Sequence, residues 1–271
     1  MRFSKFLIVS AAALAPAAAP AAGSSPLTPL LLTTTEYTQD FDTLATAGLS
    51  ADLPAGFQIV ELGSGSAADG RYAAGTGSSN AGNAYSFGAA GSTDRALGSV
   101  ASGSVGPLYL GGLFINGLDT TISDLALAFT GEQWRAANST DDGLFFQYSL
   151  DATSLDNGSW TTLSALDLLP MVFSANGAAL DGNANSVDIS ALLSDLEIAP
   201  GATFAFRWVD DNSSGSDHGL AIDDLSISAT LAQTPPAAVP EPATWAMLTL
   251  GFGLLGGGLR NGKRGARVIF A

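Results

Sequence analysis

Residues 203–210 read Thr-Phe-Ala-Phe-Arg-Trp-Val-Asp, and this stretch decides the fold class. Phe204, Phe206 and Trp208 alternate with smaller or polar residues, so the three large apolar side chains share one face of an extended chain. A helix would distribute the same side chains around its axis. This period of two predicts a β-strand with one face in an apolar core.

The same alternation recurs along the chain on both sides of this stretch. In Thr121–Phe129 it places Leu125, Leu127 and Phe129 on one face. Clusters of Gly, Asn, Asp and Ser separate further runs of this kind, which is typical of an all-β sandwich or barrel. The other predicted strands are Gly56–Leu62, Asn83–Phe87, Arg95–Val100, Leu108–Ile115, Gly143–Leu150 and Gly219–Leu231.

Three segments carry weaker patterns. Val187–Leu196 fits either a helical turn or a further strand. Residues 63–94 are rich in Gly, Ser, Ala and Asn, and we expect long surface loops around the strand at 83–87. Residues 23–35 are expected to form a loose leader, which leaves residues 36–231 as the folded domain.

Composition limits the classes of function. The 271 residues include no cysteine, so a disulfide framework is excluded and the fold depends on a hydrophobic core. Residues 23–259 hold four arginines, no lysine and 25 acidic residues, a net charge of −21. Such a surface repels nucleic acid, which excludes DNA and RNA as partners. It suits an exported domain that meets divalent cations or neutral polysaccharide, although acidic residues also simply keep a secreted protein soluble.

Residues 1–22 predict a secretory signal peptide. Arg2 and Lys5 form a positive start, Phe6–Ala15 is an apolar core too short to span a bilayer, and an Ala/Pro-rich run follows. Cleavage is expected between Ala17 and Ala22. The partners implied by this segment are the Sec translocon and signal peptidase.

The other end of the sequence has three parts. Residues 232–242 (AQTPPAAVPEP) form a Pro-rich linker. Residues 243–259 carry no charge over 17 positions, the lower limit for a membrane helix. Residues 260–271 form a basic tail, expected on the cytoplasmic side. The basic residues that stop the membrane segment are Arg260, Lys263, Arg264 and Arg267.

The motif Val239, Pro240, Glu241 and Pro242, followed by Ala-Thr-Trp-Ala-Met-Leu, the apolar run and the basic cluster, closely resembles the PEP-CTERM sorting signals of Gram-negative bacteria. The resemblance implies recognition and cleavage by an exosortase, a transient stage in the inner membrane, and delivery to the cell surface or exopolysaccharide matrix. An ordinary single-pass anchor is the alternative. Residues 268–271 (VIFA) depart from the usual pattern, in which the tag stops at the arginines.

Residues 36–231 also resemble an uncharacterised bacterial extracellular domain. The similar pieces are 39–42 (QDFD), 53–57 (LPAGF), 96–99 (ALGS), 130–135 (TGEQWR) and 220–224 (LAIDD). The resemblance implies a jelly-roll β-sandwich and carries no established activity.

Residues for catalysis are scarce. His218 is the only histidine, no cysteine exists and no GxSxG motif occurs, so the usual zinc sites and nucleophilic triads lack parts. His218 lies in an acidic loop and is expected to be solvent-exposed. We therefore expect a non-catalytic protein. The alternative is a secreted glycoside hydrolase that uses paired carboxylates, for which Glu132 and several aspartates are available.

Calcium is the favoured cofactor, because it prefers several oxygen ligands. Asp210, Asp211, Asn212 and Asp217 gather oxygens in one loop, next to the pair Asp223 and Asp224. Ile222 and Leu225 both look core-facing but lie three residues apart, which predicts a β-bulge at Asp223–Asp224. By resemblance to jelly-roll sugar-binding modules, Asp40 or Asp42 completes the shell. The alternative is that Asp and Asn here only form turns.

Glu132, Trp134 and Arg135 are the candidate ligand-binding residues. In one interpretation Trp134 stacks on a pyranose while Glu132 and Arg135 bind sugar hydroxyls, so that extracellular polysaccharide is the partner. In the other, Trp134 is a core-edge residue beside a structural Glu–Arg pair.

Overall fold

The computed structural model describes residues 23–233, 250–253 and 255. The predicted signal peptide, the Val239–Pro242 motif, most of the predicted membrane helix and its basic stop lie outside the described residues. Residues 250–253 and 255 are helical. No helix within the described residues is both long and apolar enough to cross a membrane.

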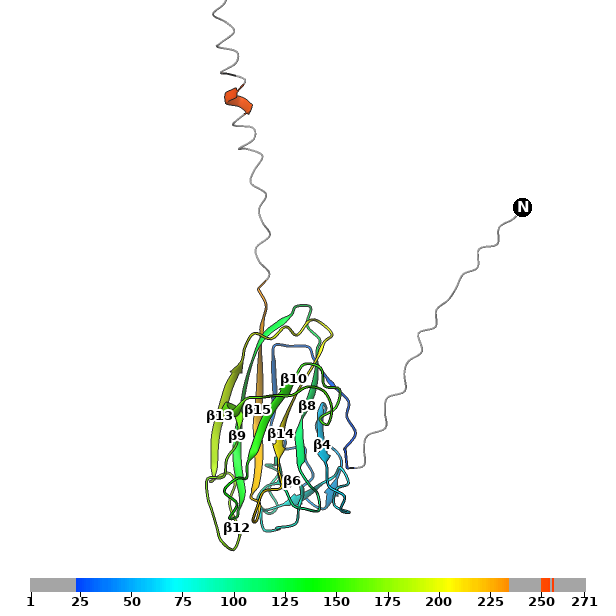
Figure 1. The fold of residues 1–271 in the computed structure, drawn as a ribbon, viewed down its shortest axis with the longest axis vertical. Helices are drawn as coiled ribbons and strands as arrows, with labels where there is room; N and C mark the ends of the chain where they lie inside the picture. Colours follow the sequence, from blue (N-terminus) through cyan, green and yellow to red (C-terminus); the bar gives the residue numbers. More distant parts are fainter. Residues whose placement is uncertain (1–22, 234–249, 254, 256–271) are drawn as a thin grey trace, which may run out of the picture. The chain divides into compact units, whose positions relative to one another are not determined.

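Residues 23–231 form a compact unit of two facing β-sheets (Figure 1), which confirms the predicted sandwich. Sheet A has the path β1-β8-β14-β10-β11, with β4 also paired to β8. Its strands are β1 (Leu30–Leu32), β4 (Phe57–Glu61), β8 (Leu108–Asn116), β10 (Leu144–Ser149), β11 (Thr161–Thr162) and β14 (Thr203–Asp210).

Sheet B has the path β12-β9-β15-β7-β6-β5-β3, with β13 also paired to β9 and β2 to β15. Its strands are β2 (Glu36–Gln39), β3 (Leu49–Ser50), β5 (Tyr72–Gly75), β6 (Asn83–Phe87), β7 (Ala96–Val100), β9 (Ile122–Ala136), β12 (Ala178–Ala179), β13 (Ser186–Leu193) and β15 (Gly219–Leu231); a 3-10 turn, η1 (Ser164–Leu166), precedes β12. From β7 to β10 and from β13 to β15, successive strands alternate between the sheets, as a jelly roll requires.

The core between the sheets contains the apolar faces that the alternation predicted. Phe204, Phe206 and Trp208 of β14 are at most 3 % exposed, and they face Leu127 and Phe129 of β9. The rings of Phe129 and Trp208 meet edge to face with centroids 5.0 Å apart. All residues of this core, with the partly buried side chains packed against it, lie between Leu30 and Leu231, so residues 23–233 contain what the sandwich needs to fold alone.

Sheet B also carries a smaller apolar cluster on its outer face. It consists of Tyr85, Phe87, Ala96, Val100, Trp134 and Ala221, whose strand neighbours Ala84, Leu97 and Leu220 point into the main core. Side chains alternate between the faces of a strand, so the cluster lies on the side of sheet B that faces away from sheet A. This side is called the outer face below.

Two predictions about the weaker segments need correction. The leader is not loose, because Leu30–Leu32 pair in parallel with Phe114–Asn116 and Ser24 forms a bridge to Val60. Residues 63–94 contain β5 in addition to the predicted β6. Short runs such as Leu30–Leu32 show no alternation, so their pairing depends on tertiary contacts. The segment 187–196 fitted either a helical turn or a strand; its residues 187–193 belong to β13, so it is mainly a strand.

Gly111 of β8 lies on the outer side of sheet A, and a substitution there tests how closely this side is packed. A Cβ there would lie 2.1 Å from the carbonyl oxygen of Phe206 and 3.0 Å from Arg207 Cβ. The missing side chain leaves room for the Arg207 guanidinium to lie over the Tyr109 ring, 3.9 Å from its centroid. We expect Gly111→Ala to lower the free energy of unfolding by about 1–3 kcal/mol in urea denaturation, because overpacking forces the sheet apart. The matched control is Gly103→Ala, whose Cβ meets nothing within 4 Å; an equal loss in both variants would contradict the packing.

Candidate functional site

Trp134 lies on the outer face in a stack of buried rings. Its indole is nearly parallel to the Phe87 ring at 6.1 Å, and Phe87 stacks on Tyr85 at 4.9 Å. A Cβ on Gly182 would lie 2.2 Å from Trp134 Nε1, so the chain at Gly182 closes over the indole. Trp134 is 3 % exposed. The interpretation of a core-edge tryptophan fits this geometry, and the predicted sugar platform has no uncovered ring face on which to form.

Glu132 binds Trp134 and does not pair with Arg135. The Trp134 Nε1–H donates to the Glu132 carboxylate at 2.7 Å. Within residues 23–233, 250–253 and 255 the only ion pair joins Arg71 to Asp69, at 2.6 Å. The structural Glu–Arg pair expected from the sequence is therefore absent from the described part of the chain.

Glu132 and Asp223 form a carboxyl pair on adjacent strands. Ala221 pairs with Glu132 and Asp223 pairs with Thr130, which places the two carboxyls on the outer face two positions apart. Burial raises the pKa of Glu132 to about 7 and that of Asp223 to about 8, and the mutual repulsion of the two groups adds to the Asp223 shift. Paired carboxyls with raised pKa values are a feature of glycoside hydrolases.

The predicted bulge is confirmed, but the calcium ligands do not assemble. The β9–β15 register shifts between Asp223 and Ser226, and Asp224 has a φ of 47°. The strand that precedes Asp40, β2, does meet the last strand, β15, since Gln39 pairs with Leu225. Asp40 and Asp42 follow Gln39 directly; Asp40 accepts from the Asp42 N–H, and Asp42 accepts from the Arg95 N–H at 3.0 Å. Among the residues that the structure describes, no three His, Asp or Glu side chains are grouped to hold a metal ion, so calcium stays a prediction.

His218 is buried, which contradicts the expected exposed loop histidine. It is 1 % exposed. Its Nδ1 lies 3.1 Å from the Ala137 N–H and 2.9 Å from Gln133 Nε2, and its Nε2 lies 3.1 Å from the Ser139 carbonyl oxygen. Because the backbone N–H of Ala137 can only donate, we assign Nδ1 as the acceptor and Nε2–H as the donor. A neutral histidine with both nitrogens occupied is a structural residue.

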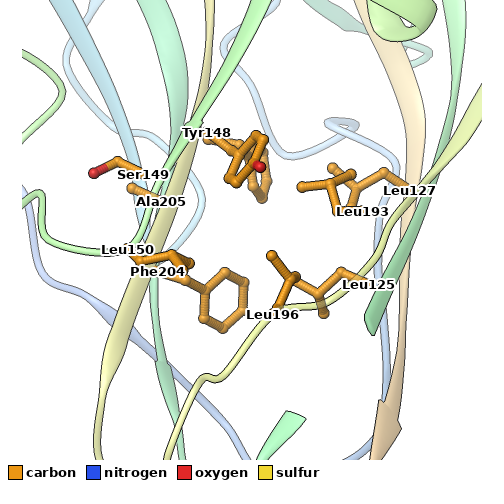
Figure 2. A pocket seen from close by; sticks show the side chains of 10 residues that line it. Leu125, Leu127, Tyr148, Ser149, Leu150, Leu193, Leu196, Phe204 and Ala205 are labelled. Atoms are coloured by element: carbon orange, nitrogen blue, oxygen red, sulfur yellow. The ribbon is translucent and has the colours of Figure 1, made fainter. Parts of the chain in front are cut away.

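The described residues include an apolar crevice between the sheets, shown in Figure 2. Phe204 and Tyr148 of sheet A face Leu125, Leu127 and Leu193 of sheet B across it. Its volume is about 10 Å³, about what one water molecule needs. The crevice is a small packing gap and not a ligand site.

Two larger hollows open on the outer side of sheet B. The first, of about 300 Å³, is called the Arg95 hollow; it is lined by Thr46, Ala73–Thr76, Ser78, Ser79, Tyr85, Ala89–Gly91 and Arg95. The second, of about 220 Å³, is called the Arg135 hollow; it is lined by Asn80, Val100–Gly103, Arg135, Asn212 and Gly215–Asp217. The loop that joins β5 to β6 contributes Ser78 and Ser79 to one hollow and Asn80 to the other, so the hollows are neighbours.

The lining of the Arg135 hollow was only partly visible in the sequence. Arg135, Asn212 and Asp217 carry a signal in the sequence, but it points to other roles. Asn80 and Ser102 carried no signal, because they lie in loops whose meeting point depends on the pairing of β6, β7 and β15.

Residues 238–264 match the PEP-CTERM protein-sorting motif. The chain carries a PEP-CTERM sorting motif. The match includes Val239–Pro242 and the basic residues from Arg260 to Arg264. The motif indicates export to the cell surface and processing by an exosortase. No curated protein is significantly similar to the chain in sequence.

Among solved structures, the K3 cleaved adhesin domain of Lys-gingipain from Porphyromonas gingivalis is 14 % identical, covers 72 % of this chain and 91 % of its own, and has a TM-score of 0.35. The CBM22-1 xylan-binding domain of Xyn10C from Paenibacillus barcinonensis is 10 % identical, with 73 % and 95 % covered and a TM-score of 0.34. Values this low carry no argument about function, and the fold follows from the strand pairing described above.

Proposed function

We propose that residues 36–231 of this PEP-CTERM protein form a non-catalytic polysaccharide-binding domain of the cell surface or exopolysaccharide matrix. In this proposal residues 232–242 are the linker, residues 243–259 span the inner membrane transiently, and residues 260–271 are the cytoplasmic tail.

The pair of polar hollows on the outer side of sheet B is the observation that carries the proposal. Hydroxyl side chains line both hollows together with glycine and alanine, amide side chains add to the Arg135 hollow, and each hollow also holds one arginine. Hydroxyl and amide groups both donate and accept hydrogen bonds, as sugar hydroxyls do. The negative charge of the domain favours a neutral polysaccharide over an acidic one.

A glycan array with residues 23–233, run with calcium and with EDTA, tests the proposal. We expect retention on a neutral polysaccharide without release of shorter products. Equal retention in both buffers would show that calcium is not needed. Failure to bind any polysaccharide on the array would contradict the proposal.

A secreted hydrolase is the second candidate, because the Glu132–Asp223 pair has the raised pKa values of an acid catalyst. Neither residue lines the Arg95 or the Arg135 hollow. Chromatography of the array polysaccharides after incubation separates the two functions. Product release that Asp223→Asn abolishes would establish the hydrolase and overturn the binding-only proposal.

A further inference from the structure

We propose that the Arg135 hollow binds one neutral sugar residue, with Arg135 as hydrogen-bond donor and Asp217 as acceptor. This inference rests on the proposed polysaccharide binding and names its site and ligand class.

Arg135 enters the hollow because β9 is irregular at this point. Gly219 pairs with Arg135 and Leu220 with Gln133, which leaves Trp134 without a partner on β15. Trp134 is therefore an extra residue in β9. It turns the next side chain, Arg135, to the outer side of sheet B, where Trp134 itself lies. A Cβ on Gly219 would lie 2.9 Å from Arg135 Cβ, so the absence of a side chain at Gly219 gives the arginine its room.

The Arg135 guanidinium is buried with only part of its donors occupied. The side chain is 8 % exposed, and Nη1 donates to the carbonyl oxygens of Gly77 at 3.3 Å and Ser78 at 3.4 Å. Its Nε is buried and has no partner among the described residues. An unpaired buried donor costs about 1–3 kcal/mol, and more when it is charged. Nη2 forms no hydrogen bond within the described residues either, and unlike Nε it is not among the fully enclosed atoms. A ligand oxygen in the hollow would give Nη2 the partner that these residues do not supply.

Asp217 provides an acceptor in the same hollow. It is 7 % exposed, and its Oδ1 accepts from the Ser213 N–H at 3.2 Å. Its Oδ2 takes part in no hydrogen bond within the part of the chain that the structure describes. Burial, with the nearby Asp142 adding to it, raises the pKa of Asp217 to about 7.

A donor and an acceptor in one small hollow fit adjacent hydroxyl groups, because each hydroxyl both donates and accepts. Asn80 and Asn212 add amides of the same dual character. An acidic sugar would place its carboxylate close to Asp217, with Asp142 behind it, which opposes binding. The volume of about 220 Å³ lies below the range of about 300–1,000 Å³ for drug-sized ligands, so the hollow holds one residue of a glycan chain.

Selective labelling of arginine gives a direct test. Residues 23–233 contain only Arg71, Arg95, Arg135 and Arg207, so protein labelled with ¹⁵N-arginine yields at most four Nε–H signals, and Arg135→Lys assigns one of them. The probes are cellohexaose, xylohexaose, mannohexaose and maltohexaose, together with hexagalacturonate as the acidic probe. We expect a neutral probe to shift the Arg135 signal and to leave the Arg71 signal unchanged.

Affinity measurements on variants complete the test. We expect Arg135→Gln and Asp217→Asn each to weaken binding of that neutral probe at least about tenfold, the loss of one charged hydrogen bond. Asp217→Asn keeps an oxygen for the Ser213 N–H, and melting curves verify that each variant folds. The matched controls are Arg71→Gln and Asp69→Asn, which line neither hollow.

The outcomes separate this inference from the function on which it rests. If no glycan on the array and no probe binds the wild-type domain, the proposed function itself fails. If glycans bind but the Arg95 signal moves instead, or Arg135→Gln keeps full affinity, the site assignment is wrong and the function stands. Tighter binding of hexagalacturonate than of every neutral probe would overturn the ligand class.

Discussion

Trp208→Ala is expected to lower the free energy of unfolding by about 3–5 kcal/mol, the range for removal of a large buried aromatic side chain. Trp208 is 0 % exposed and meets the rings of Phe129 at 5.0 Å and Phe146 at 5.3 Å. Its Nε1–H also donates to the Leu166 carbonyl oxygen at 3.3 Å. The substitution therefore leaves both a cavity between the sheets and an unpaired carbonyl.

The measurement is urea denaturation of residues 23–233 followed by far-UV circular dichroism, because this signal does not depend on the tryptophan that is removed. The matched control is Trp160→Ala. Trp160 is half-buried on the outer side of sheet A, where Arg207 lies over its ring at 4.0 Å. We expect this control to lose about 1 kcal/mol, in the range of an arginine–aromatic contact. A similar loss in both variants would mean that Trp208 does not hold the two sheets together.

The sequence predicted the strands that have one apolar and one polar face. The bounds of β14, β15 and β6 coincide with the predicted runs, because alternation is a local property that one strand carries by itself. The bulge at Asp223–Asp224 was predictable for the same reason. Ile222 and Leu225 both face the core but lie three positions apart, and a regular strand would turn them to opposite faces.

The strands that lack alternation could not be predicted in this way. β1 is Leu-Leu-Leu and β5 is Tyr-Ala-Ala-Gly, and both form because neighbouring strands offer unpaired backbone groups. β9 was predicted to end at Phe129 but continues to Ala136. This extension buries Glu132, Trp134 and Arg135, which explains why three residues that looked like a surface ligand platform lie at most 8 % exposed.

The candidate site depends on contacts between segments far apart in the sequence. His218 looked exposed because its neighbours are acidic and polar, yet Gln133, Ala137 and Ser139 of another strand and loop surround its ring. The Arg135 hollow likewise joins the loops 76–82, 101–107 and 211–218. No local pattern marks such a meeting point, so only the structure reveals it.

The protein is expected to be most stable in mildly acidic solution and to lose stability as the pH rises from about 4 to about 8. Burial raises the pKa of Asp217 to about 7 and that of Asp223 to about 8, and it also raises the pKa of Asp210. In the unfolded chain these carboxyls titrate near 3.9. The folded state therefore holds more protons throughout this range, and linkage requires the free energy of unfolding to fall as the pH increases.

Each carboxyl that keeps its proton on folding contributes a slope on the order of 1.4 kcal/mol per pH unit, between its unfolded and its folded pKa. Urea denaturation from pH 4.5 to pH 8.5 measures the combined slope. Asp223→Asn mimics the protonated carboxyl and retains an oxygen for the Asp224 N–H, which the wild-type Oδ1 accepts at 2.7 Å. We expect this variant to match the wild type at pH 4.5 and to exceed its stability at pH 8.5.

The exposed Asp119 provides the control for this profile. Asp119→Asn removes the same charge from the protein but no buried carboxyl, so its stability is expected to follow the wild-type curve at every pH. Asp151 has a lowered pKa because its carboxylate accepts from the Ser159 N–H. Its ionisation therefore favours the folded state, but the pH dependence of this effect lies below the pKa of the unfolded chain and outside the measured range.

A wild-type stability that is flat or rises between pH 4.5 and pH 8.5 would show that Asp210, Asp217 and Asp223 are ionised in the folded protein. These carboxyls would then need a cation partner, and calcium would again be the first to test.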